Sequence, residues 1–166
     1  MADYHSPTVV DTLIPVSDIN ELEHLLLTNI FEFDLHEDRL YFHHWEGAQS
    51  YISVNRCKFK AAAAKADYGE NSPLAELLKQ ERNAPKGETE IELDLGETSF
   101  EFLFQNIVRR SQTLKHIAVI TSFTCTKMRQ DGWGGMATVI TADKIAGKST
   151  HDIVRELLDA AEIEAE

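Results

Sequence analysis

The sequence predicts an α+β fold: a mixed, mainly antiparallel sheet with helices packed mostly on one face. Two observations lead to this class. Segments that alternate apolar and polar residues, as half-buried strands do, are interspersed with segments whose apolar residues recur every three or four positions, as in amphipathic helices. Several strand-like segments are also joined by short turns, which favours hairpins and therefore antiparallel pairs.

Length and composition fit a single domain that spans residues 1–166. The chain has 166 residues, 43% of them hydrophobic, and a chain of this length buries roughly two-thirds of its unfolded surface. Residues 1–16 contain Pro7 and Pro15 and lack a sustained period. We therefore expect these residues to form an extended N-terminal arm.

A hairpin is the clearest element of the first half. The segments 30–35 and 40–45 flank a short turn at 36–39, and a two-residue loop within that turn sets the register. The pairs expected on the buried side are Phe33 with Phe42 and Leu35 with Leu40. The pairs expected on the open side are Glu32 with His43 and Asp34 with Tyr41.

Periodicity and capping residues predict the remaining elements. They are a helix begun by a capping box of Asp18 and Glu21, a strand at 51–55, a helix at 57–66, a loop at 68–71, a helix from Ser72 to Gln80, a strand at 88–95, a helix begun by a capping box of Thr98 and Glu101, a central strand at 116–127, a return strand at 136–142, and a last helix capped by Ser149 or Thr150 with an apolar stripe of Ile153, Val154, Leu157, Leu158 and Ala161. A strand–helix–strand crossover would place 88–95 and 116–127 side by side and parallel.

Charge and composition restrict the partners. The formal net charge of −12 argues against direct binding to nucleic acid or to an anionic membrane, because both require clustered Lys and Arg. It favours cations, basic protein surfaces or small molecules held in a local pocket. Cys57 and Cys125 form no paired-cysteine motif, and the N-terminus does not resemble a secretion signal. We expect a cytoplasmic protein.

An acidic strand is the sharpest single feature. Glu88, Glu90, Glu92 and Asp94 alternate with apolar residues or threonine, so a strand places all four on one face, roughly 6.5–7 Å apart. This row has two functional interpretations: a docking stripe for a basic partner, or a mimic of the nucleic-acid backbone. The last helix would extend the negative field through Asp152, Glu156, Asp159, Glu162, Glu164 and Glu166. The structural alternative is a solvated edge strand whose charge discourages aggregation.

Trp133 is a second candidate contact. It lies in a turn that contains three glycines, at 130–135, and an exposed aromatic on an adaptable turn suits a partner pocket or a stacked ligand. Alternatively, Trp133 folds back to cover the end of the sheet.

The hairpin offers a site for chemistry. On its open side, His43 joins Glu32 and Asp34, which suggests either a metal site of mixed nitrogen and oxygen ligands or a histidine that acts as acid or base. The structural alternative is ordinary cross-strand electrostatics between a histidine and two carboxylates. The sequence lacks the histidine or cysteine spacings typical of metal sites, so we predict neither a metal nor a cofactor.

Two further motifs favour structure over chemistry. Residues 142–150 resemble a loose phosphate-binding loop, but Ala142 replaces the first glycine, and a helix start explains the pattern equally well. Cys125 with His116 or His151 would make a nucleophile–base pair, but Cys125 lies in the middle of an apolar strand.

The sequence therefore predicts a non-catalytic interaction or regulatory module that contacts partners through the acidic strand face and Trp133. We expect a homo-oligomer, because the uncharged faces of the central strand need to be covered. The alternatives are a small metal-dependent or acid/base enzyme with its site on the 30–45 hairpin, and a nucleic-acid mimic that inhibits a DNA-binding protein.

Overall fold

The α+β class is confirmed. The structure is a computed structural model that describes residues 2–66, 68, 72–96 and 98–161. Its helices are α1 (Glu21–Ile30), α2 (Arg56–Lys65), α3 (Leu74–Asn83), α4 (Phe100–Arg110) and α5 (Thr150–Ala160), with a short 3-10 turn at Val16–Asp18. Its strands are β1 (Tyr4–His5), β2 (Thr8–Val10), β3 (Ile14–Pro15), β4 (Glu32–His36), β5 (Arg39–His44), β6 (Tyr51–Asn55), β7 (Glu90–Asp94), β8 (His116–Cys125), β9 (Gly134–Thr141) and β10 (Ile145–Ser149).

The strands form two separate sheets. The larger has the order β10-β9-β8-β2-β5-β3, with β1 paired to β8 and β4 paired to β5, and the smaller consists of β6 and β7. Among the described residues every strand pairing is antiparallel. The prediction that 88–95 lies parallel beside 116–127 is therefore wrong. The helix between them, α4, carries the chain from the small sheet to the large one, so β7 pairs with β6 instead.

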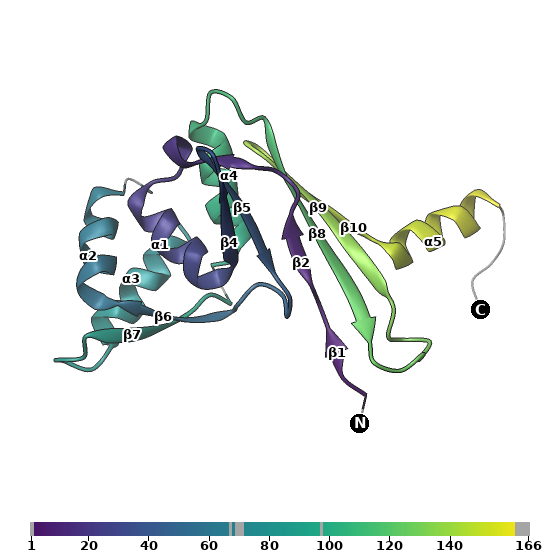
Figure 1. The fold of residues 1–166 in the computed structure, drawn as a ribbon, viewed down its shortest axis with the longest axis horizontal. Coiled ribbons are helices and arrows are strands. Elements are labelled where there is room, and N and C mark those ends of the chain that lie inside the picture. Colours follow the sequence, from purple (N-terminus) through teal and green to yellow (C-terminus); the bar gives the residue numbers. More distant parts are fainter. Residues whose placement is uncertain (1, 67, 69–71, 97, 162–166) are drawn as a thin grey trace.

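Helices α1 to α4 lie on one side of the large sheet, as the sequence predicted (Figure 1). The amphipathic helix α4 packs on β8 and β9, and α1 packs on α4. Phe104 of α4 is fully buried and contacts Phe42 of β5 and Phe31, with ring centroids 6.1 and 6.0 Å apart. Helix α5 is the exception, since it extends away from this body (Figure 1).

The hairpin of β4 and β5 has the predicted register, with Phe33 opposite Phe42 and Leu35 opposite Leu40. Glu37 takes the turn's left-handed conformation, at φ 58°. The expected burial of both pairs is wrong for β4: Phe33 and Leu35 are 44% and 62% exposed. β4 is an edge strand that pairs with β5, and only the β5 partners, Phe42 and Leu40, enter the core.

The N-terminal arm is extended but belongs to the sheet. β2 lies between β8 and β5, β1 continues along β8, and β3 pairs with β5. The arm therefore links the first hairpin to the C-terminal strands. Its short strands and two prolines lack the alternation from which sheet pairing is predicted.

Two predicted helix caps are wrong, because another residue takes the N-cap position. The capping box of α1 is formed by Asn20 and Glu23, two positions after the predicted pair of Asp18 and Glu21. Thr98 does not cap α4; its hydroxyl donates to the carbonyl of Pro73 at 2.7 Å, and Ser99 takes the N-cap position. Of the loop predicted at 68–71, the structure describes Tyr68, which lies outside the helices and strands. Residues 69–71 lie outside the described residues.

Within 142–150, residues Ile145–Ser149 form the strand β10, and α5 begins at Thr150, so a helix start is confirmed and the segment is not a phosphate loop. Gly147 lies opposite Thr138 in the hairpin of β9 and β10. The predicted cap by Ser149 is confirmed, since it forms a capping box with Asp152.

Candidate functional site

The acidic strand faces an open groove. In β7, Glu90, Glu92 and Asp94 are exposed, while Ile91 and Leu93 are buried. The groove has a volume of about 750 Å³ and lies between this strand and the end of α3. Its polar lining is formed by Glu88, Glu90 and Glu92, with Ser53, Gln80 and Asn83. We call this feature the acidic groove.

Asp94 has a structural role that separates it from the other acids. The side-chain amide of Gln80 accepts the Asp94 N–H at 2.8 Å and donates to the Asp94 carbonyl at 2.9 Å. The Asp94 carboxylate accepts the Gly96 N–H at 2.8 Å. Glu90 also accepts a hydrogen bond, from the side-chain amide of Asn55 at 3.2 Å. Glu88, Glu90 and Glu92 line the acidic groove, whereas Asp94 anchors the end of the strand.

Arg56, at the start of α2, is committed to the fold. Arg56 donates to the buried carboxylate of Glu81 at 2.8 Å, to the Glu81 carbonyl at 3.0 Å and to the Pro85 carbonyl at 2.8 Å. These bonds tie the start of α2 to the end of α3 and fix one wall of the acidic groove. The guanidinium is thereby directed at Glu81 and the loop, and not at the groove carboxylates.

The structure separates Trp133 from the acidic strand. The β8–β9 turn that carries Trp133 and the helix α5 lie at the opposite end of the molecule from β7 (Figure 1). Trp133 is 45% exposed. The acidic strand and Trp133 are therefore two separate candidate contacts, and one short partner segment does not reach both.

The same separation applies to the acidic residues of α5. Asp152, Glu156 and Asp159 are remote from β7, so the negative field of β7 does not continue onto the last helix (Figure 1). Glu162, Glu164 and Glu166 lie outside the described residues.

The hairpin residues are brought together as predicted. His43 Nε2 lies 3.1 Å from the Asp34 carboxylate, and its Nδ1 lies 3.8 Å from the Glu32 carboxylate. Tyr41 stacks beside His43, with centroids 5.1 Å apart. All four line an open pocket of about 550 Å³ that also includes Trp45.

This arrangement suits an acid/base histidine better than a metal site. The two carboxylates approach different ring nitrogens of His43, so the three side chains do not converge on one point. Across the described residues, no group of three or more His, Cys, Asp and Glu side chains is placed to hold a metal ion. A cysteine–histidine pair is also excluded for Cys125 and His116, because they lie at opposite ends of β8, about 30 Å apart.

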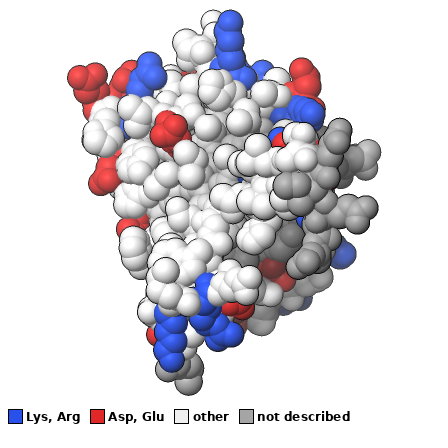
Figure 2. Space-filling model, turned by 90° about the vertical axis from the view of Figure 1, so that its right-hand side faces the viewer, with Lys and Arg blue, Asp and Glu red and all other residues white. Residues whose placement is uncertain are grey.

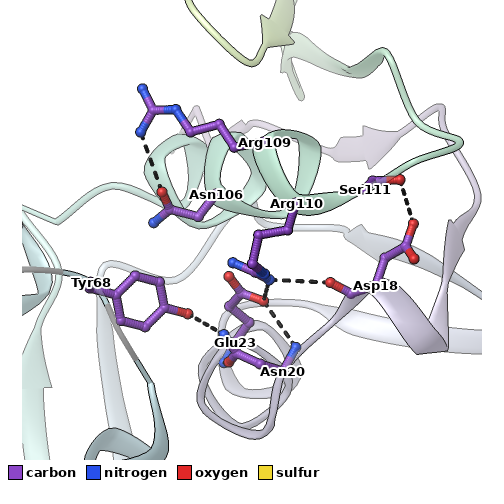
Figure 3. A network of polar contacts seen from close by, with 8 residues as sticks. All are labelled: Asp18, Asn20, Glu23, Tyr68, Asn106, Arg109, Arg110 and Ser111. Carbon is purple, nitrogen blue, oxygen red and sulfur yellow. Dashed lines mark hydrogen bonds and ion pairs between the residues drawn. The ribbon is translucent and has the colours of Figure 1, made fainter.

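A buried ionic cluster, which the sequence did not reveal, joins α1 to α4 (Figure 3). Glu23 is fully buried, accepts the Asn20 N–H at 3.0 Å and pairs with Arg110. Arg110 also donates to the Asp18 carbonyl at 3.2 Å. The other Glu23 oxygen has no partner among the described residues. The cluster ties the end of α4 to the start of α1.

Titration in this cluster follows from burial and charge. Burial and the neighbouring Glu23 carboxylate raise the pKa of Tyr68 well above its usual value. Burial alone would lower the pKa of Arg110, but the hydrogen bond and charge of Glu23 outweigh it, so that pKa is raised. Both groups therefore keep their ordinary protonation at neutral pH, and the cluster is structural. The only sequence signal for it was a capping-box pattern at Asn20 and Glu23.

No protein-family model, curated protein or solved structure matches this chain. Its described helices include none that is long and apolar enough to cross a membrane.

Proposed function

We propose that the protein is a non-catalytic interaction module whose acidic groove binds a basic segment of a partner protein. The observation that carries this proposal is the row formed by Glu88, Glu90 and Glu92 along one wall of an open groove. Carboxylates gathered in a concave site attract cationic groups more strongly than the same charges scattered over a convex surface.

The spacing of the row favours an extended partner. Carboxylates two residues apart on a strand repeat every 6.5–7 Å or so. An extended peptide repeats its side chains on one face at the same interval, so Lys or Arg at every second position meets each carboxylate in turn. A helical partner presents side chains on one face about every 5.4 Å, the length of one turn, and this interval does not match the spacing of the carboxylates.

The polar groups opposite the row support the same partner. Gln80 and Asn83 stand at the end of α3, across from the carboxylates. Asn83 presents an amide that can donate to or accept from a peptide backbone. The groove thus offers charges for side chains on one wall and hydrogen bonds for the main chain on the other.

Nucleic-acid mimicry is a weaker proposal. A mimic presents a negative field that extends over a wide surface, because a DNA-binding groove contacts many phosphates. Here the described acidic row consists of β7 and Glu88, which lies just before the strand begins at Glu90, and the acids of α5 lie at the far end of the molecule (Figure 1). A short basic segment matches the size of this row better than a DNA-binding groove does.

The test is the binding of a labelled peptide that carries Lys at alternate positions, followed by fluorescence anisotropy. The variant Glu90→Gln with Glu92→Gln should weaken binding about ten-fold, since each exposed ion pair contributes up to about 1 kcal/mol. The matched control is Asp143→Asn with Glu46→Gln, which removes two exposed carboxylates elsewhere and should leave the affinity unchanged. An equal loss in both variants would mean that net charge alone attracts the peptide.

The hairpin pocket gives a second candidate function, acid/base catalysis by His43. The supporting observation is that Asp34 and Glu32 contact its two ring nitrogens beside an open pocket. Wild type and His43→Gln would be compared on a panel of chromogenic ester and phosphate substrates. Turnover that the variant lacks would favour the enzyme, and identical background rates would count against it.

A further inference from the structure

The backbone of β7 has one edge that no other strand occupies. In the described part of the chain, β7 pairs with β6 alone. The end of α3 lies at the opposite edge of β7, because Gln80 bonds there to the main chain of Asp94. The acidic groove is open between this edge and the end of α3. A free edge presents N–H and C=O groups that can bind another strand.

A hydrogen bond at the start of β7 shows which groups point to the free edge. The Thr89 carbonyl accepts the Arg56 N–H at 2.8 Å, so it faces β6, which Arg56 directly follows. A trans peptide directs its C=O and N–H to opposite sides, so the Glu90 N–H faces away from β6. The groups alternate between the two edges from residue to residue in an antiparallel strand. The N–H and C=O groups of Glu90 and Glu92 therefore point to the free edge.

The side chain of Gln80 already binds this edge as a strand would. Its amide accepts the Asp94 N–H at 2.8 Å and donates to the Asp94 carbonyl at 2.9 Å. The exchange of both bonds with a single residue is the pattern of a hydrogen-bonded antiparallel pair. The next two positions of this kind are Glu92 and Glu90, which line the open groove of about 750 Å³. A strand placed in the groove would continue the pairing that Gln80 begins.

We propose that the basic segment of the partner adds to β7 as a third, antiparallel strand that pairs with Glu90 and Glu92 through its main chain. This inference rests on the function proposed for the acidic groove and specifies how the partner binds there. Residues directly opposite each other in an antiparallel pair lie on the same face. Lys or Arg opposite Glu90 and Glu92 thus supplies both the main-chain hydrogen bonds and the charge that meets each carboxylate.

Charge determines which strand this edge accepts. A second copy of β7 would place carboxylates opposite carboxylates, and like charges that lie opposite each other are destabilising. The acidic side chains therefore discourage self-association at the edge, and they select a segment with Lys or Arg at alternate positions. The protective role and the binding role of the acidic row are compatible.

The free edge of the large sheet does not offer the same match. This edge is β10, whose five residues include Lys148 and no Asp or Glu. Figure 2 shows the side of the molecule that carries α5 and β10, where Lys, Arg, Asp and Glu lie mostly around the rim of a largely uncharged surface. A basic strand therefore meets a row of opposite charge at β7 and not at β10.

Backbone methylation of the peptide tests the added strand without changing the protein. Two peptides with Lys at alternate positions carry the same charge and the same number of N-methyl groups, placed on the Lys residues in one and on the intervening residues in the other. Antiparallel addition directs the Lys N–H groups at β7. Methylation of Lys should therefore weaken binding about ten-fold or more, since two hydrogen bonds are lost, and methylation of the intervening residues should cost much less. Equal losses, or the reverse pattern, overturn the proposal.

Amide hydrogen exchange, followed by nuclear magnetic resonance, tests the same pairing on the protein. In the complex with the unmethylated peptide, the N–H groups of Glu90 and Glu92 should exchange about ten-fold more slowly than in the free protein. Those of Ile91 and Leu93, which face β6, should change less. If the peptide binds but Glu90 and Glu92 gain no protection, the added strand is overturned and the function proposed for the groove stands. If the peptide does not bind, the proposed function fails and the added strand fails with it.

Discussion

Loss of Arg110 provides a direct test of the buried cluster that joins α1 to α4. Arg110→Met keeps most of the aliphatic side chain but leaves the Glu23 carboxylate without its cation. Removing one member of a buried ion pair typically costs 3–5 kcal/mol or so. The Arg110 side chain is 42% exposed, so water already screens the pair and the expected cost falls to about 2–3 kcal/mol. For a domain of this size, that loss lowers the midpoint of thermal unfolding by about 5–10 °C.

The assay is thermal and urea unfolding followed by circular dichroism, with Arg109→Met as the matched control. Arg109 donates to the Ala142 carbonyl at 2.7 Å and to Gln105 at 3.0 Å, and its loss leaves no buried carboxylate behind. We expect the control to lose about 1 kcal/mol or less. The double variant Glu23→Gln with Arg110→Met should recover part of the loss, because it removes the buried charge. Equal destabilisation by Arg109→Met and Arg110→Met would refute the reasoning.

Three further outcomes follow from the same geometry. Hydrogen bonds from the Ser149 hydroxyl and N–H lower the pKa of Asp152. The cap therefore stabilises α5 fully at pH values above the ordinary carboxyl pKa, and this stabilisation is lost as the pH falls through the lowered pKa. The helicity measured in acid should fall less in Asp152→Asn than in wild type, because the variant lacks this titrating group. Gly147→Val should cost about 1 kcal/mol or less in urea unfolding, because its Cβ comes closest to the movable end of the half-exposed Met136 side chain, and Ala146→Val, on the other face of β10, should also be nearly neutral. Titrating sodium chloride should weaken peptide binding to the acidic groove, because salt screens exposed ion pairs, and an affinity that does not change with salt would contradict the role of the carboxylates.

The sequence predicts those elements whose signal is local. The strand with alternating acids at β7 and the hairpin register of β4 and β5 are both found in the structure. Both follow from side-chain period and turn length, which depend on neighbours in the chain. The capping box of α5 at Ser149 is likewise predicted from residues that are close together in the chain.

Predictions that depended on distant residues failed. Nothing near Glu90 specifies that β7 pairs with β6 and not with β8. The exposure of Phe33 depends on the position of β4 at the edge of the sheet, which the sequence of the hairpin does not specify. These features depend on tertiary structure, which the spacing of apolar and polar residues along the chain does not determine.

The candidate site, like the fold, could be predicted from the sequence only where the signal is local. The acids of β7 were identified from their spacing, and Glu32, Asp34 and His43 were placed together by strand register. The groove itself was not predictable, because α3 contributes its other wall through Gln80 and Asn83. Neither was the distance between the acidic strand and Trp133, which depends on the order of the strands.

Nuclear magnetic resonance titration of the isotopically labelled protein with the alternating-lysine peptide tests the central claim most directly. The account predicts that amide shifts change at Glu88, Glu90 and Glu92, and at Gln80 and Asn83 across the groove. Shifts confined to the hairpin around His43 or to α5, with β7 unaffected, would contradict it.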